Sequence, residues 1–178
     1  MSGRDHSDLG ESALVVVVPE AEEAVGRWRA AHDPSADRGV PAHVTVLFPF
    51  FPAAEIDDGV LGTLDALASD VDPFTATFRS VERRTDGVWM RPEPEDPFRR
   101  LTRAVWTRWP ELPPYGGIHA DVIPHLTVAG GEAPRGVETA VSAHLPIVTR
   151  VAAMELIAFD GDRWTTRERF PLGRDEGR

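Results

Sequence analysis

Residues 43–46 read His-Val-Thr-Val, and residues 125–128 read His-Leu-Thr-Val. Side chains alternate between the two faces of a β-strand, so each segment places its histidine and threonine on one face and two aliphatic residues on the other. The aliphatic face would pack against helices, which leaves the polar pair open on the opposite face. The sequence therefore predicts two strands that each carry one His/Thr pair.

The segments around these two strands recur in the same order. Apolar spacing of 3.6 residues predicts helices, and short apolar or alternating runs predict strands. Asp86-Gly87 and Asp160-Gly161 predict a turn near the end of each unit. We infer an internal duplication of roughly 75 to 80 residues, too long for a solenoid repeat. The expected helices cover residues 21–31, 56–67, 98–109 and 137–144. The expected further strands cover residues 14–18, 74–78, 88–91 and 148–159, with a last strand from residue 164 onward.

Such a duplication predicts an α+β, bilobal fold in which two antiparallel sheets with outer helices surround a central cleft. We expect one domain over residues 13–172, with lobes at about 13–90 and 91–172. Residues 1–12 and 173–178 are expected to be disordered tails. If a pseudo-twofold axis relates the lobes, the two His/Thr pairs face each other across the cleft.

The composition excludes several classes of function. The chain has no cysteine, which excludes disulfides, thiolate zinc sites and cysteine nucleophiles. The formal net charge of -10 argues against a protein that coats long nucleic acid, although a local arginine pocket could still hold one terminal phosphate. No apolar run approaches the length of a membrane span or a signal peptide. We therefore expect a cytoplasmic monomer with no membrane partner, whose substrate is a small nucleotide or an RNA terminus.

The paired residues suit acid–base chemistry on a phosphate ester. A histidine titrates near neutral pH, so one of the pair can accept a proton while the other donates one. The threonine hydroxyls can donate hydrogen bonds to phosphate oxygens. This chemistry needs no cofactor and no metal, and the sequence leaves open which histidine is the acid. A metal site with Asp121 is disfavoured, because threonine is a poor zinc ligand and the histidines lack the usual ligand spacing.

Two longer segments connect this pattern to a known family. Residues 41–50 read Pro-Ala-His-Val-Thr-Val-Leu-Phe-Pro-Phe, and residues 123–129 read Ile-Pro-His-Leu-Thr-Val-Ala. Both resemble the motifs of the 2H phosphoesterase (LigT-like) superfamily, and most closely those of bacterial 2'-5' RNA ligase-like proteins and cyclic phosphodiesterases. The resemblance extends over residues 14–172.

The resemblance implies hydrolysis of 2',3'-cyclic phosphates or related 2'-linked, RNA-derived phosphodiesters. It implies that the catalytic residues are His43, Thr45, His125 and Thr127. The hydrophobic fourth positions of the motifs match the family as well and are not expected to do chemistry.

Four further residues are candidates for substrate binding. Phe48 and Phe50 could form an aromatic wall for a base, or could pack in the core. Tyr115 could stack on a base, or could anchor its loop. His119 could line the mouth of the cleft, or could be an ordinary exposed histidine. Four arginines cluster around the hairpin expected at Asp86-Gly87, and one of them could bind phosphate while most form a solvated face: Arg79, Arg83, Arg84 and Arg91.

Two other functions remain open from the sequence. The same cleft could bind a cyclic or 2'-phosphorylated nucleotide without converting it, although a pure binder has no need for two acid–base groups. The protein could also join RNA ends as a 2'-5' RNA ligase, because microscopic reversibility permits ligation where hydrolysis is slow. Unchanged ligand would indicate the binding module, and a 2'-5'-linked product would indicate the ligase.

Overall fold

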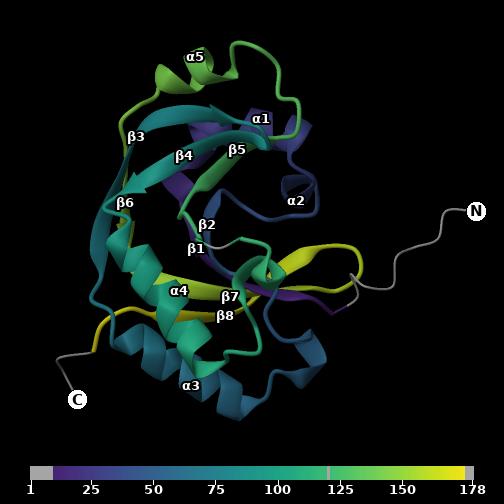
Figure 1. Cartoon of the computed structure of the whole chain (residues 1–178), viewed down its shortest axis with the longest axis vertical. Helices are drawn as coiled ribbons and strands as arrows, with labels where there is room; N and C mark the ends of the chain where they lie inside the picture. Colours follow the sequence, from purple (N-terminus) through teal and green to yellow (C-terminus); the bar gives the residue numbers. More distant parts are fainter. Residues whose placement is uncertain (1–9, 120, 175–178) are drawn as a thin grey trace, which may run out of the picture.

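The computed structural model describes residues 10–119 and 121–174. Within that part of the chain, eight strands form one antiparallel sheet in the order β6-β3-β4-β5-β2-β1-β7-β8 (Figure 1). This confirms the α+β class. The strands are β1 (Ser12–Val17), β2 (His43–Leu47), β3 (Phe74–Arg84), β4 (Gly87–Glu93), β5 (Leu126–Gly130), β6 (Ile147–Val151), β7 (Ala153–Phe159) and β8 (Trp164–Pro171).

The sheet has two halves that meet where β2 lies beside β5. The junction is short, with Val44 paired to Leu126. Outward from it, β1, β7 and β8 follow β2 on one side, and β4, β3 and β6 follow β5 on the other. The two expected sheets are therefore joined edge to edge into one curled sheet, and each motif strand lies at the inner edge of its half.

Each half of the sheet takes strands from both parts of the chain. β1 pairs with β7, and β3 pairs with β6, so the sheet does not divide at residues 90 and 91. The expectation of a single strand over residues 148–159 is wrong. It is two strands, β6 and β7, which separate at Ala152 and enter opposite halves. An apolar run carries no mark of this crossover when both of its parts are buried.

The four expected helices are confirmed, with ends shifted by a few residues. The helices are α1 (Glu22–His32), α2 (Pro34–Asp37), α3 (Asp58–Ser69), α4 (Asp96–Arg108) and α5 (Val137–Ser142), with 3-10 turns η2 (Pro19–Ala21), η3 (Ala53–Glu55) and η4 (Pro114–Gly117). Helix α1 follows β1 but packs on β5, and α4 follows β4 but packs on β2. Each unit thus supplies the helix that covers the motif strand of the other unit, which ties the two units together.

The main core lies between the helices and the sheet. Val44, Val46, Leu126 and Val128 are at most 1% exposed, and all belong to this core. The histidine and threonine of each motif alternate with them and are only partly buried, as the strand pattern predicts. The packing that fixes the two strands therefore presents both polar pairs on the opposite face.

The ends of the chain fall partly outside the described residues. Disordered tails were expected at residues 1–12 and 173–178. Of these, residues 1–9 and 175–178 lie outside the described residues, and Ser12 already belongs to β1. Across residues 10–119 and 121–174, no helix has the length and apolar character needed to cross a bilayer.

Candidate active site

The register of the β2–β5 junction brings the two motifs together. Val44 is the partner of Leu126 in an antiparallel pair. Continued by one residue in each direction, this register places His43 opposite Thr127 and Thr45 opposite His125. Directly opposite residues have Cβ atoms about 4.5–5.5 Å apart. The four predicted catalytic residues therefore form one cluster, in which each histidine faces the threonine of the other motif.

Both histidines are held in the same way. Nδ1 of His43 lies 2.8 Å from the carbonyl oxygen of Pro41, and Nδ1 of His125 lies 2.8 Å from that of Ile123. A carbonyl oxygen can only accept, so Nδ1 carries the hydrogen and donates it. In the neutral ring this leaves Nε2 with a free lone pair. The two-residue step from carbonyl to histidine thus sets the same tautomer in both motifs.

Burial makes both imidazoles harder to protonate. Loss of solvation lowers the pKa of His43 to about 4; the nearby Arg29 and His125 add to this, while the Pro41 carbonyl and Asp33 oppose it. Burial also lowers the pKa of His125, against the opposing effects of the Ile123 carbonyl and Asp86. Both rings are therefore neutral near pH 7 until an anion binds and favours the imidazolium.

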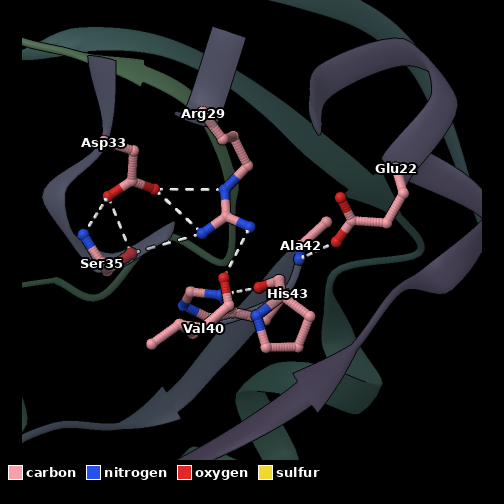
Figure 2. Close-up of polar contacts among 8 residues, drawn as sticks. Glu22, Arg29, Asp33, Ser35, Val40, Ala42 and His43 are labelled. Atoms are coloured by element: carbon pink, nitrogen blue, oxygen red, sulfur yellow. Dashed lines mark hydrogen bonds and ion pairs between the residues drawn. The ribbon is translucent and has the colours of Figure 1, made fainter. Parts of the chain in front are cut away.

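Figure 2 shows the surroundings of His43. Arg29, only 2% exposed, donates to Asp33 from Nε at 3.1 Å and from Nη2 at 3.0 Å. It also donates from Nη1 to the carbonyl oxygen of Val40 at 3.1 Å. Asp33 in turn accepts from the backbone and the hydroxyl of Ser35. A buried ion pair therefore lies next to the strand entry that carries His43.

An apolar hollow of about 170 Å³ opens beside His43 and Thr45. Its aromatic wall is formed by Phe48 and Trp164, whose ring centroids lie 6.2 Å apart in an edge-to-face arrangement. The rest of the lining is mostly aliphatic and comes from β1, β7 and the segment before β2: Ala13, Val15, Val40 and Ile157. A hollow of this kind suits the flat apolar face of a nucleobase.

A more polar hollow of about 350 Å³ opens beside His125. The indole of Trp89 stacks on the imidazole of His125, with ring centroids 3.7 Å apart and 11° between the ring planes. The guanidinium carbon of Arg84 lies 4.8 Å from the centroid of the same indole. Arg84 and Asp86 both line this hollow and are exposed. The two histidines thus have different neighbours although their motifs match.

Tyr115 lines both hollows. Its side chain hydrogen-bonds to that of Thr45, and its backbone N–H donates to the carbonyl of Phe48 at 2.6 Å. Burial raises the pKa of its phenol. Its φ of 52° makes it the one non-glycine residue with positive φ in the described chain. The loop is therefore held in a strained conformation at the residue that contacts Thr45 and lines both hollows.

The structure brings three of the four substrate-binding candidates to the cleft. Phe48 and Tyr115 line it, and the exposed His119 lies at its mouth, with its ring centroid 5.8 Å from that of Tyr115. Phe50 lies elsewhere: it is 4% exposed in the main core and packs edge-to-face on Phe51 and Trp109. It is two residues past Phe48, but the chain turns at the strand end, so strand alternation no longer applies.

Sequence reasoning missed Arg29 and Trp89. Arg29 continues the spacing of Ala21 and Val25 along one helix face, and both of those residues are fully buried. An arginine at such a position indicates a buried ion pair. Trp89 lies in β4 between the buried Val88 and Met90, so strand alternation places it on the opposite face. Both signals were present in the sequence.

The cluster offers two proton-transfer groups and several hydroxyl donors on one face of the sheet. Across the described ranges, 10–119 and 121–174, no group of three or more histidine, cysteine or carboxylate side chains is arranged to hold a metal ion. Two neutral imidazoles and neighbouring hydroxyls suit acid–base catalysis on a phosphate ester.

Comparison with known proteins agrees with this geometry. The family model described as the 2'-5' RNA ligase superfamily matches residues 17–163. Similar solved structures include TT0787 of Thermus thermophilus, at 23% identity and a TM-score of 0.61, with 93% of this chain and 100% of that chain covered. The apo form of E. coli LigT matches at 20% identity and a TM-score of 0.59, with 94% and 99% covered.

A protein described as a phosphoesterase matches at 20% identity and a TM-score of 0.59, with 93% of this chain and 99% of that chain covered. At such identities the similarity shows the fold alone. No curated protein matches the chain. The family match spans both motifs, which the structure joins at the β2–β5 junction, and the chain therefore belongs to the 2'-5' RNA ligase superfamily of 2H phosphoesterases.

Proposed function

We propose that this protein is a metal-independent phosphodiesterase that hydrolyses 2',3'-cyclic phosphates or related 2'-linked, RNA-derived phosphodiesters. The observation that carries the proposal is the cluster at the β2–β5 junction. His43 and His125 lie there on one face, and each has Nδ1 fixed on a backbone carbonyl. Both Nε2 atoms are then available to one substrate, which is the arrangement that paired acid–base catalysis needs.

The different surroundings of the two histidines favour different roles. Arg29 lies near His43 and disfavours a second positive charge, so His43 suits the general base that takes a proton from water. At His125 the effect of Asp86, which favours the charged form, exceeds that of Arg84, which opposes it, and the π face of Trp89 can attract an imidazolium. His125 therefore suits the general acid.

In this reaction the water oxygen forms a bond to phosphorus while the bond from phosphorus to one ribose oxygen breaks. His43 accepts the proton of the water, and His125 gives its proton to the departing ribose oxygen. Thr45 and Thr127 donate hydrogen bonds to the non-bridging phosphate oxygens, where negative charge is held through the transition state. The net result is addition of one water and formation of a phosphomonoester.

The apolar hollow between Phe48 and Trp164 is the proposed site of the base, because aromatic side chains stack on any base. E. coli LigT, which shares the fold, has been crystallised with 3'-AMP, ATP, NADP+ and phosphate. These ligands support a nucleotide as the class of substrate. They leave the particular base and ester open to experiment.

Phosphorus NMR in EDTA tests the proposal directly. The purified protein is incubated with a panel of nucleoside 2',3'-cyclic phosphates, beside a His43→Ala/His125→Ala double variant and a His144→Ala control. His144 is exposed on the α5 side and belongs to neither motif. We expect wild type and control to form one monophosphate isomer and the double variant to form none.

Turnover by the double variant would contradict the assigned roles. The same panel, repeated with an oligonucleotide that carries a free 5'-hydroxyl, tests ligation. A 2'-5'-linked product in place of the monophosphate would reassign the protein as a ligase. Binding of a panel member without conversion would favour a binding module.

A further inference from the structure

The two motif segments are preceded by the same arginine contact. Nη1 of Arg29, on α1, donates to the carbonyl oxygen of Val40 at 3.1 Å. Nη1 of Arg99, on α4, donates to the carbonyl oxygen of Val122 at 3.0 Å. Val40 and Val122 each lie three residues before a motif histidine. The contact therefore recurs at equivalent places in the two units.

The position of the contact links it to the histidines. The residue after Val40 is Pro41, whose carbonyl oxygen holds Nδ1 of His43. The residue after Val122 is Ile123, whose carbonyl oxygen holds Nδ1 of His125. Each arginine thus fixes the peptide group next to the one that orients the imidazole. Figure 2 shows this sequence of contacts from Arg29 through Val40 to His43.

Each arginine is itself held by acidic side chains. Asp33 accepts from Nε and Nη2 of Arg29, so the remaining donor, Nη1, points to the backbone. Glu95 accepts from Nε and Nη2 of Arg99 at 3.3 and 3.2 Å, and Asp121 accepts from Nη1 at 2.8 Å. The planar fork of a guanidinium can bind a carboxylate through two nitrogens and still donate to a carbonyl, whereas the single ammonium nitrogen of a lysine cannot reproduce this bidentate geometry.

The residue just before each motif histidine differs between the two units. In the first unit, the backbone N–H of Ala42 donates to Glu22 at 2.6 Å, so α1 holds the peptide groups on both sides of Pro41. Glu22 and Arg29 lie seven residues apart, about two turns along one helix face. In the second unit Pro124 replaces Ala42. Proline has no N–H to hold, and its ring already fixes the backbone.

We propose that Arg29 and Arg99 are equivalent positioning residues for the two catalytic histidines. Each would hold the backbone carbonyl that sets the tautomer and orientation of its histidine, without contact to the substrate. Their catalytic effect rests on the proposed function, whereas their effect on the histidine tautomer does not. The duplication would then have preserved a supporting arginine together with each motif.

Arg99 offers the cleaner test, because Arg29 is only 2% exposed and its removal would leave Asp33 without its partner. The side chain of Arg99 is 28% exposed. The test variant is Arg99→Met, which keeps length and removes every donor. The matched control is Arg100→Met. Arg100 lies on the same helix and likewise pairs with an acid four residues earlier, Asp96. Because adjacent residues of a helix point about 100° apart, Arg100 lies on a different face of α4 from Arg99.

Two measurements separate positioning from a general effect on folding. Steady-state kinetics on the cyclic nucleotide panel should show a fall in kcat of about 10- to 100-fold in Arg99→Met, with KM changed less than about twofold. Nitrogen-15 NMR of labelled histidine at pH 8 should show His125 as the Nδ1–H tautomer in wild type. In Arg99→Met the signal should move toward a mixture of tautomers, with His43 unchanged.

Arg100→Met should match wild type in both measurements. An Arg29→Lys variant should produce the same tautomer shift at His43, because one ammonium nitrogen cannot replace the three guanidinium nitrogens that hold Asp33 and Val40. The proposal is overturned if His125 in Arg99→Met keeps the wild-type tautomer, or if Arg100→Met shows equal losses. If wild type converts no phosphodiester, the proposed function fails, and the NMR result still decides whether these arginines position the histidines.

Discussion

The imidazole of His125 lies face to face with the indole of Trp89, with ring centroids 3.7 Å apart. Trp89 pairs with Thr127 across β4 and β5, so the stack is built on two bonded strands. On the other side of the junction, His43 lies beside the buried Arg29 instead. Each histidine has a guanidinium nearby that disfavours its charged form, whereas His125 also has a π face that can stabilise it. The duplicated site is therefore chemically asymmetric.

Replacement of Trp89 with leucine should weaken catalysis without abolishing it. Leucine fills part of the space and removes the stack, and aromatic pairs contribute about 0.5–1.5 kcal/mol beyond burial. We expect a loss in kcat of roughly 2- to 12-fold, measured by steady-state kinetics on a cyclic nucleotide. Trp106→Leu is the control, because Trp106 is 43% exposed on α4. Equal losses in the two variants would show that the stack has no specific role.

The stability of the protein should fall with acidification through His43. Its pKa is lowered from 6.5 to about 4 on folding. Between these values the unfolded chain binds a proton that the folded chain does not, so the free energy of unfolding decreases as pH falls below 6.5. The contribution lost between pH 7.5 and pH 5 is about 2 kcal/mol.

Urea unfolding of wild type and His43→Gln at these two pH values measures this effect. We expect the loss to be smaller in His43→Gln by that amount, while His144→Gln follows wild type because His144 is exposed. Equal pH dependence in wild type and His43→Gln would show that His43 titrates normally in the folded protein.

Strand alternation was sufficient to predict which face of the sheet carries the two His/Thr pairs. The apolar positions Val44, Val46, Leu126 and Val128 are fully buried, and the histidines and threonines between them are only partly buried. The pairing of Val44 with Leu126 could not be read in the same way. A periodic pattern fixes which face of a strand is buried, whereas the partner strand depends on how distant segments pack.

The residues around the histidines show the same limit. The local sequence pattern indicates which face of the helix carries Arg29 and which face of the strand carries Trp89. It does not indicate which distant residues these side chains contact. The contact of Arg29 with Val40 depends on a helix that packs across the junction, and the Trp89–His125 stack depends on the register of β4 with β5. Phe50 shows a different limit. It follows the first His/Thr motif closely in the sequence, which made it a candidate for base binding, but its side chain packs in the main core.

The pH dependence of kcat/KM should identify the acid and the base. His43, as base, must be neutral, so the rate falls as pH drops toward about 4. His125, as acid, must be protonated, and since its pKa is lowered, the rate falls at high pH through a midpoint below 6.5. We therefore expect a bell-shaped profile with its maximum on the acid side of pH 6.5.

The single variants assign the two limbs. His43→Ala should lose the acidic limb and His125→Ala the alkaline limb, each with a rate reduced by about 10² to 10⁴. Profiles of kcat/KM from pH 4 to 8.5 measure both, and circular dichroism at each pH confirms that the variants stay folded. The reverse pattern, with the acidic limb lost in His125→Ala, would exchange the two roles.

Trp164→Ala should weaken binding of substrates that carry a base. Trp164 forms one wall of the apolar hollow beside His43, with Phe48 edge-to-face against it. Stacking on an aromatic side chain is worth about 1–3 kcal/mol per base, which corresponds to a rise in KM of roughly 5- to 150-fold with kcat little changed. Ribose 2',3'-cyclic phosphate without a base is the matched control substrate, since it reaches both histidines but cannot use the hollow. Its kcat/KM should be the same in wild type and variant. An equal loss with both substrates would mean that Trp164 supports the site structurally, through its packing on Phe159 with ring centroids 5.6 Å apart, rather than by contact with the base.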